Sequence, residues 1–352
     1  MVRKLELCID ALLYITGLIR LARWWNRRAG KRLVVLCYHR MEGGYLREHL
    51  RYLRRHYRIL HLETALEELY APNEEMVHNW DHRTLLALTF DDGYHDHYTY
   101  GFQLVRQLQV PITIFLIPGY IENRQRFWWG EAEYLLSHTP VREATIEGKT
   151  YHLEKPDDRH ALLDLIEQRV RYARSVAERE MFITRLYDIL ALPMRTEVEG
   201  DVQRSLTWQE VQEMQHCEWI SFGAHTMFHP ILACLKDPSE LLYEVAHSRL
   251  AIEQELQCPV RLFAYPVGKE EHIGSQAIYA VQKAGYTWAL TTIHGINTPK
   301  TDPLQVHRIV VDVEQPWLLI AAKASGLWDF LIALGRPRAF FKKCLLFIGR
   351  ER

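Results

Sequence analysis

Residues 85–94 read LLALTFDDGY, an apolar run that ends in two adjacent carboxylates. The run predicts a buried strand, so Asp91 and Asp92 should lie where that strand ends. Adjacent buried carboxylates are costly unless a cation or hydrogen-bond donors neutralise them. One could therefore bind a metal while the other takes a proton from water, with Gly93 allowing a sharp turn. A plain Asp-Gly turn before a helix is the ordinary alternative.

Six further segments have the composition of strands, at residues 33–38, 112–117, 219–222, 261–265, 288–292 and 306–311. Helical patterns separate them, including 239–256, which Ser239 could cap, and a helix opened by a capping box from Thr207 to Glu210. This alternation predicts an α/β fold with a parallel sheet, a distorted (β/α) barrel of about seven strands with a helical insertion. Chemistry in such barrels lies at the carboxyl ends of the strands.

One segment, residues 140–204, interrupts the alternation. It predicts a hairpin over 145–153 that turns at Gly148, followed by a charged helical stretch over 157–192. We therefore expect three parts: an N-terminal amphipathic segment at 1–32, a catalytic domain at 33–314 that carries this insertion, and a basic amphipathic tail at 315–352.

Both ends of the chain combine basic and apolar residues. The uninterrupted apolar part of the first segment, residues 11–19, is shorter than the roughly 20 residues that span a bilayer, and no cleavable signal peptide is recognisable. Trp24 and Trp25 beside Arg27 and Arg28 fit a helix on a membrane surface, a helix packed on the domain or an uncleaved signal anchor. We expect a cytoplasmic protein, or one that is peripheral at the inner face of the membrane.

Bulk composition narrows the function only by exclusion. The chain has 352 residues and a formal net charge of −1, so nothing suggests nucleic acid as a partner. Its six cysteines are dispersed, with no CxxC pair, which indicates free thiols in a reducing compartment. Cys37 is expected to be an ordinary buried thiol. The oligomeric state is not indicated.

A second motif places two imidazoles four residues apart, at His225 and His229 in the string HTMFHP. On a helical turn this spacing points both rings the same way, as in many zinc sites. With one aspartate they offer two nitrogens and one oxygen, a set that suits Zn and also Fe, Co, Ni or Mn. Histidines so spaced are also common in cores and on surfaces, so the aspartate pair on the same predicted sheet is what favours a metal site.

Together the two motifs resemble the polysaccharide deacetylases that share the NodB homology domain, carbohydrate esterase family 4. The strings TFDDGY at 89–94 and HTxxHP at 225–230 both stand intact and in that order. Supporting strings are LCYHR at 36–40, FAYPVG at 263–268 and TTIHGIN at 291–297. The resemblance runs from about residue 33 to residue 312, apart from the insertion.

This resemblance implies a role for each matching residue. Asp91 would be the general base, and Asp92, His225 and His229 would bind a divalent metal ion, with zinc the expected one. The backbone amide of Tyr94 would stabilise the oxyanion. The implied reaction is hydrolysis of the N-acetyl group of an N-acetylated polysaccharide or glycan.

One departure from the family pattern concerns the base. An arginine that orients it often stands two residues before the proline of the third motif, where this chain has Ala264, and the nearest arginine is Arg261. Base orientation must then come from elsewhere, or the activity is altered. A carbohydrate-binding protein of the same fold without turnover is therefore an alternative. Another is a deacetylase of a lipid-linked sugar at the membrane surface, which would give the basic and apolar termini a purpose.

The other departure concerns the acid, because the usual C-terminal motif with the acid histidine is not recognisable. In family members with a permuted motif order an N-terminal Tyr-His string supplies that acid, and His39 matches it. His294, after the predicted strand at 288–292, is the competing candidate, whereas His307 lies within a predicted strand and is expected to be structural.

Aromatic residues beside these motifs are expected to shape the pocket. Tyr265 and Pro266 should form its floor, and a structural role for them competes with a contact to substrate. Trp128 and Trp129 follow the predicted strand at 112–117, and they could stack on a sugar or close a lid onto the insertion.

Overall fold

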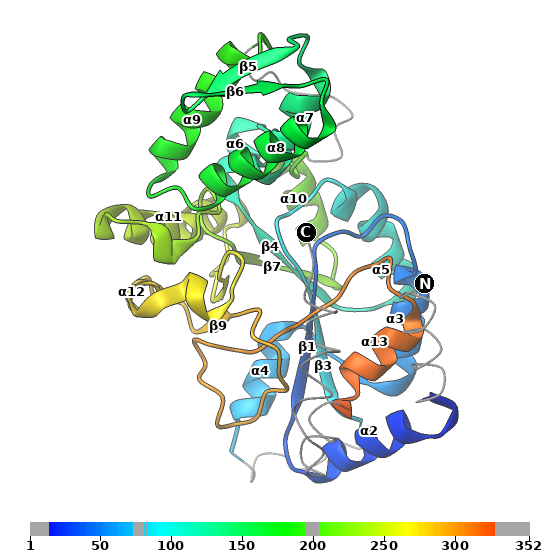
Figure 1. Cartoon of the computed structure of the whole chain (residues 1–352). Coiled ribbons are helices and arrows are strands. Elements are labelled where there is room, and N and C mark those ends of the chain that lie inside the picture. The colour runs from blue at the N-terminus through cyan, green and yellow to red at the C-terminus, as the bar shows by residue number, and fades with distance from the viewer. Residues whose placement is uncertain (1–13, 73–80, 82, 194–203, 328–352) are drawn as a thin grey trace.

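The fold is a parallel half-barrel, seen in a computed structural model that describes residues 14–72, 81, 83–193 and 204–327 (Figure 1). Seven strands follow the order β10-β1-β3-β4-β7-β8-β9, and β2 also pairs with β3. The strands are β1 (Leu33–Tyr38), β2 (Arg58–Ile59), β3 (Leu85–Phe90), β4 (Ile112–Leu116), β7 (Ile220–Ala224), β8 (Leu262–Ala264), β9 (Trp288–Leu290) and β10 (Ile309–Val310). Neighbouring strands in this order all pair in parallel, as expected for apolar strands covered on both faces. The predicted distorted (β/α) barrel is thus confirmed.

The last predicted strand differs from the others. Only Ile309–Val310 pairs with β1, while Val306 forms an isolated parallel bridge with Leu290 at the end of β9. The segment therefore crosses from one edge of the half-barrel to the other and narrows its open side. Arg308 lies within this crossing, which becomes important for the site.

Helices connect and cover the strands: α2 (Leu18–Arg28), α3 (Leu46–His56), α4 (Leu62–Tyr70), α5 (Phe102–Leu108), α6 (Pro118–Asn123), α7 (Glu131–His138), α8 (Pro156–Arg171), α9 (Val176–Ile189), α10 (Trp208–Gln215), α11 (Pro238–Leu256), α12 (Glu270–Lys283) and α13 (Trp317–Ala324). The capping box that opens α10 is confirmed by the reciprocal bonds between Thr207 and Glu210. The cap predicted for α11 is wrong. Asp237 takes that place, because its carboxylate accepts the Ser239 N–H at 2.8 Å and Pro238 then begins the helix.

The insertion builds a small body of its own at one end of the sheet, at the top of Figure 1. Its predicted hairpin is present as β5 (Glu143–Ile146) and β6 (Lys149–His152), paired antiparallel. The charged stretch predicted after the hairpin divides into α8 and α9, because Ser175 caps a new helix start by accepting the Glu178 N–H. Its apolar core continues into the barrel through Tyr94 and Ile117.

The opposite end of the sheet carries α2, which packs beside α3 and α13 (Figure 1). Asn26 of α2 donates to the Ser325 carbonyl at 2.6 Å, and Arg23 donates to the Tyr52 hydroxyl at 2.9 Å. Among the described residues, no helix is both long enough and apolar enough to cross a membrane. The predictions for residues 1–13 and for the basic tail beyond residue 327 lie outside the described residues.

Candidate active site

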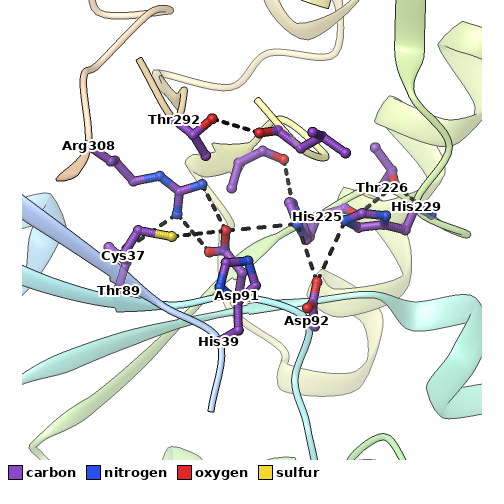
Figure 2. Close-up of polar contacts among 12 residues, drawn as sticks. Cys37, His39, Thr89, Asp91, Asp92, His225, Thr226, His229, Thr292 and Arg308 are labelled. Carbon is purple, nitrogen blue, oxygen red and sulfur yellow. Dashed lines mark hydrogen bonds and ion pairs between the residues drawn. The ribbon is translucent and has the colours of Figure 1, made fainter. Parts of the chain in front are cut away.

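Asp91 and Asp92 lie at the carboxyl end of β3, with both side chains buried. The backbone turns sharply here, since Asp92 has φ 72° and Gly93 has φ 65°. Two successive left-handed residues break the alternation of a strand, so neighbouring carboxylates reach the same region (Figure 2). The turn predicted at Gly93 therefore starts one residue earlier, at an aspartate whose left-handed backbone is costlier than that of glycine.

Asp91 is surrounded by hydrogen-bond donors. The Arg308 guanidinium binds it with two parallel bonds, Nη1 to Oδ1 at 2.7 Å and Nη2 to Oδ2 at 2.8 Å, and the Cys37 thiol donates to Oδ2 at 3.4 Å (Figure 2). Burial by itself would raise the pKa of Asp91, but Arg308 and His225 outweigh it and hold that pKa below its usual range. Asp91 is thus kept ionised in a buried place.

Arg308 takes the place of the arginine that is absent at position 264, because it pairs with Asp91. The Arg308 side chain is fully buried, and it spans the open side of the half-barrel because its Nε also donates to the Thr291 carbonyl at 2.9 Å. Arg261, the nearest arginine in sequence, instead pairs with Glu63 of α4 at 2.9 Å. Sequence reasoning missed Arg308, although an arginine inside a predicted strand that is mostly apolar was a usable signal.

Cys37 lies deeper in the site than the sequence suggested. Its thiol is buried at the end of β1 and faces Asp91, so it is more than an ordinary core thiol. Burial raises its pKa, and the charge of Asp91 adds to this although Arg308 opposes it. The thiol therefore keeps its proton and donates it to the carboxylate. Four described cysteines, Cys37, Cys217, Cys234 and Cys258, are free.

Asp92 has the opposite environment. Its buried Oδ1 has no hydrogen-bond partner among the described residues, and Nε2 of His225 and Nε2 of His229 each lie 3.6 Å from it. Burial and the charge of Asp91 raise the pKa of Asp92 to about 7, with His39 opposing them. A buried carboxylate oxygen without a donor, facing two imidazole nitrogens, is an arrangement that a cation would satisfy.

The two histidines lie on a loop after β7 and not on the helical turn predicted for them. Thr226 and His229 have left-handed φ values of 64° and 55°, which bend the loop so that the two ring centroids lie 4.7 Å apart. The Nδ1 of His225 donates to the Ala264 carbonyl at 2.7 Å, which leaves its Nε2 with a free lone pair directed at Asp92. The spacing of four residues was right, but the local conformation was not.

Several buried groups hold this loop in place. Glu244 of α11 accepts the backbone N–H groups of Met227 and Phe228 at 3.0 and 2.9 Å. Arg179 of the insertion helix α9 donates to the Phe228 carbonyl at 2.9 Å. The Trp128 indole donates to the His229 carbonyl at 3.0 Å. The loop is therefore held from two sides, by the barrel and by the insertion.

Asp92, His225 and His229 fit a divalent metal. Their ligand atoms lie within 4.8 Å of one another, and two of the separations are 3.6 Å. A tetrahedral ion with bonds of about 2.1 Å separates its ligands by roughly 3.4 Å, which is close to these two separations. Three protein ligands leave one position open for water or substrate, as in catalytic rather than structural zinc sites.

The remaining predicted residues are His39, Tyr94, His294 and His307, and they differ in solvent exposure and in hydrogen bonding. His39 is exposed, and its ring lies within 4.8 Å of the Asp91 carboxylate and the Cys37 thiol. The backbone N–H of Tyr94 donates to none of the described residues. A group that donates to an oxyanion must be free in this way. His294 is exposed on the loop after β9, and His307 is half-buried.

The aromatic residues near the site support it more than they line it. Tyr265 is buried, and its hydroxyl donates to the Leu304 carbonyl at 3.0 Å, while Pro266 is buried next to it. Trp129 is half-buried, 4.7 Å from the His229 ring, and its indole donates to the Tyr94 hydroxyl at 2.7 Å. Of the two tryptophans, Trp129 therefore has the face that a sugar could reach.

At its strand ends the half-barrel brings together an aspartate paired with an arginine, Asp91, and a converging set of Asp92, His225 and His229, an arrangement suited to hydrolysis. The family model for polysaccharide deacetylase matches residues 78–289, and the chain belongs to this family. It is accordingly a deacetylase, a hydrolase that acts on amide bonds of a carbohydrate. The resemblance drawn from the two motifs is confirmed. Deacetylases of this family generally use a divalent metal.

Solved structures agree on the fold. The Streptococcus pyogenes deacetylase PplD in complex with acetate aligns with TM-score 0.53 at 16% identity, covering 83% of this chain and 98% of that one. IcaB from Ammonifex degensii aligns with TM-score 0.53 at 20% identity, covering 84% and 98%. The BpsB deacetylase domain from Bordetella bronchiseptica aligns with TM-score 0.50 at 14% identity, covering 80% and 96%. No curated protein sequence matches the chain.

Proposed function

We propose that this protein is a metal-dependent deacetylase that hydrolyses the N-acetyl group of an N-acetylated polysaccharide or glycan. One observation supports this more than any other: two adjacent aspartates have opposite surroundings. Asp91 has all its partners from the protein, whereas Asp92 faces His225 and His229 with a bare oxygen. A base and a metal ligand need just this difference.

The division of work follows from these surroundings. Asp92, His225 and His229 would hold the ion, and zinc is the expected one on this donor set. A bound divalent ion polarises an amide carbonyl and acidifies a water. Asp91, held ionised by Arg308, would accept the proton of the attacking water.

Two further groups would serve the tetrahedral intermediate. The Tyr94 N–H has no acceptor among the described residues, so it is available to donate to the oxyanion. His39 is solvent-accessible and within 4.8 Å of Asp91, which suits a group that gives a proton to the departing amine.

Arg308 also bears on the interpretation as a binding protein without turnover. That alternative was supported by the missing arginine at position 264, and Arg308 supplies an equivalent guanidinium from the segment that leads into β10. A pure binding protein would have no use for a buried, ionised Asp91 with a thiol and a guanidinium on it. Turnover is therefore the better explanation of the site.

The test measures metal and product together. The purified protein should contain, or take up, about one divalent ion per chain, and it should release acetate from N-acetylglucosamine oligomers. A chelator should stop acetate release, and added zinc should restore it. A lipid-linked N-acetyl sugar, assayed in parallel, distinguishes the alternative substrate. Bound metal with no acetate from either substrate would overturn the deacetylase proposal.

The acid can be assigned by a matched pair of variants. His39→Ala should lower turnover about 100-fold, within the range found for general acids, whereas His294→Ala should change it less than about threefold. Both histidines are exposed, so neither change should disturb folding. Rates on oligomers, with metal content checked, give the answer, and the reverse ranking would assign the acid to His294.

A further inference from the structure

The exposed face of α2 combines arginines with large apolar side chains. Leu21 and Trp24 are each 44% exposed, and Ile15 just before the helix is 80% exposed. Arg20, Arg27 and Arg28 share this face, while Ile19, Ala22 and Asn26 on the other face are buried. The helix contains no acidic residue. Arg28 lies over the Trp24 ring at 4.5 Å, so charge and apolar surface are in direct contact.

Neighbouring residues extend the positive charge beyond α2. Burial lowers the pKa of His56 to about 4, and the positive charges of the nearby Arg23, Arg55, Arg20 and Arg83 add to the shift. Asp81 is an acidic group in this neighbourhood, and it is already paired with Arg83 at 2.6 Å. The chain as a whole has a net charge of −1, so the basic surface here is a local concentration and not a general property.

We propose that this face, formed by Ile15, Leu21 and Trp24 with Arg20, Arg27 and Arg28, docks on an anionic lipid bilayer. A helix with an apolar and arginine-rich outer face lies in the plane of the interface, with its apolar side chains among the headgroups and its cations on the phosphates. Arginines are well suited to phosphate, because the guanidinium donates in pairs.

The chain's own tail is the competing occupant of the face. The described part of the chain ends beside α2, where Ser325 accepts from Asn26. The following residues, 328–352, contain six basic and two acidic residues, so their net charge has the same sign as that of α2. Like charges disfavour the tail as a cover. An anionic surface, in contrast, attracts the tail and the helix alike.

This docking sets the distance between the membrane and the chemistry. The helix lies at the end where β1 begins, and the active site lies at the end where β1 and β3 finish (Figure 1). Six residues of strand separate the two ends by roughly 20 Å. If the proposed function holds, the site works above the headgroup layer, which suits a polymer more than a sugar carried on a lipid. The docking itself does not depend on that function.

Vesicle sedimentation of the full-length protein tests the proposal. The protein should sediment with phosphatidylcholine vesicles that contain phosphatidylglycerol, and not with phosphatidylcholine alone. Each arginine near an anionic surface contributes roughly a fivefold gain in partitioning, so the combined variant Arg20→Glu, Arg27→Glu, Arg28→Glu should bind at least about 100-fold more weakly. The pair Leu21→Ala, Trp24→Ala should also weaken binding, but without changing its salt dependence.

A matched control has the same change in net charge elsewhere. Arg159→Glu, Arg185→Glu and Lys283→Glu alter exposed positions on α8, α9 and α12, and together they should leave binding within about twofold of wild type. If wild type ignores anionic vesicles, or if the control weakens binding as much as the α2 variant, the proposal is wrong. Acetate release from soluble oligomers should be the same for all these variants, so a failure of docking is distinguishable from a failure of the proposed function.

Cysteine labelling separates the bilayer from the tail. In Leu21→Cys the new thiol should react quickly with a maleimide in solution and become protected when anionic vesicles are added, with mass spectrometry locating the label. Slow labelling without vesicles would mean that the chain itself covers the face, and the proposal would fall. Binding that survives the α2 variant but is lost on reversing Arg336, Arg338, Lys342 and Lys343 would assign the docking to the tail and overturn the proposal for α2.

Discussion

Asp91 and Asp92 are neighbours in sequence and both are buried, but their hydrogen-bond partners differ, although His225 lies near both carboxylates. Asp91 receives a thiol from β1 and a bidentate guanidinium from the segment that leads into β10, while an oxygen of Asp92 receives nothing from the described residues. The pKa of Asp91 lies below its usual range, because Arg308 and His225 overcome the effect of burial. The pKa of Asp92 is raised to about 7 by burial and by the charge of Asp91.

The site therefore has two halves, one around Asp91 and one around Asp92 with His225 and His229, and each half is stabilised by different partners. The Asp91 half is complete as the protein folds, since its charge is balanced by residues of the barrel itself. Under the proposed function a cation would complete the Asp92 half. Three left-handed non-glycine residues, Asp92 after β3 and Thr226 and His229 after β7, bring its three side chains together. Strain of this kind persists only where the surroundings enforce it, and it gathers at functional sites.

The largest effect should come from removing the charge of Asp91, the proposed base. Asp91→Asn keeps the shape and loses the proton acceptor, so turnover should fall by about 10³-fold or more. Metal content should stay at the wild-type level, because this substitution leaves Asp92, His225 and His229 untouched. Acetate release and metal analysis on the same sample check both. Loss of metal along with activity would refute the separation of the two halves.

The second-largest fall in turnover is expected when Arg308 can no longer make its two parallel hydrogen bonds to Asp91. Arg308→Lys keeps one positive charge but cannot bind both carboxylate oxygens, so Asp91 loses its fixed orientation. We expect turnover to fall about 10- to 100-fold with metal affinity unchanged. Arg261→Lys is the matched control, because that arginine pairs with Glu63 away from the site. A weaker metal affinity in Arg308→Lys would mean that the two halves are coupled.

The residues grouped around Asp92 could be predicted from the sequence more easily than the partners of Asp91. Asp92, His225 and His229 could be predicted because two short local motifs hold them, and each motif follows an apolar strand. Arg308 could not be assigned, because its partner is 217 positions away in the chain and only the closing of the half-barrel joins them. The seven strands followed from apolar composition, whereas β2 has two residues and leaves no pattern.

Local conformation was predicted less well than position. The histidine spacing suggested a helical turn, but left-handed residues at Thr226 and His229 make a loop, and such residues have no sequence signature unless they are glycine or asparagine. The break between α8 and α9 depends on one cap at Ser175 within a stretch that is charged and helical on both sides. Support from Arg179 and Glu244 was invisible for the same reason as Arg308, because it crosses between distant elements.

A smaller effect should follow from weakening the contact between the insertion and the loop that carries His225 and His229, the proposed metal ligands. Arg179→Met keeps the buried stem but loses the bond to the Phe228 carbonyl, so the affinity for zinc should fall about 10-fold. Arg185→Met, exposed on the same helix, should leave the affinity unchanged. Competition with a chromophoric chelator measures both. If Arg179→Met lowers the melting temperature but not the zinc affinity, the insertion is only structural.

The smallest effect on activity is expected at His49, whose surroundings contrast most with those of the proposed metal ligands His225 and His229. This buried histidine has both nitrogens engaged by the protein: Nε2 donates to the Gln315 carbonyl at 2.6 Å, and Nδ1 accepts from the Tyr38 hydroxyl at 3.3 Å. Its neutral form is therefore complete without a metal. Burial lowers its pKa to about 4, although the Gln315 carbonyl opposes the shift.

A lowered folded-state pKa makes stability depend on pH in one direction. The contribution of His49 is fully present above its ordinary pKa of roughly 6.5, and it is lost as the pH falls from there toward the folded value of about 4. The loss amounts to about 3 kcal/mol of the free energy of unfolding. His49→Gln retains one donor and one acceptor but cannot titrate, so its unfolding free energy should decline less over this range. His160→Gln, at an exposed position, should keep the wild-type slope of unfolding free energy against pH.

At pH 7 the activity and metal content of His49→Gln should be normal, because a histidine whose two nitrogens are both hydrogen-bonded has no lone pair left for an ion. A loss of metal in this variant would contradict the distinction between hydrogen-bonded and unpaired groups on which the proposed metal site rests.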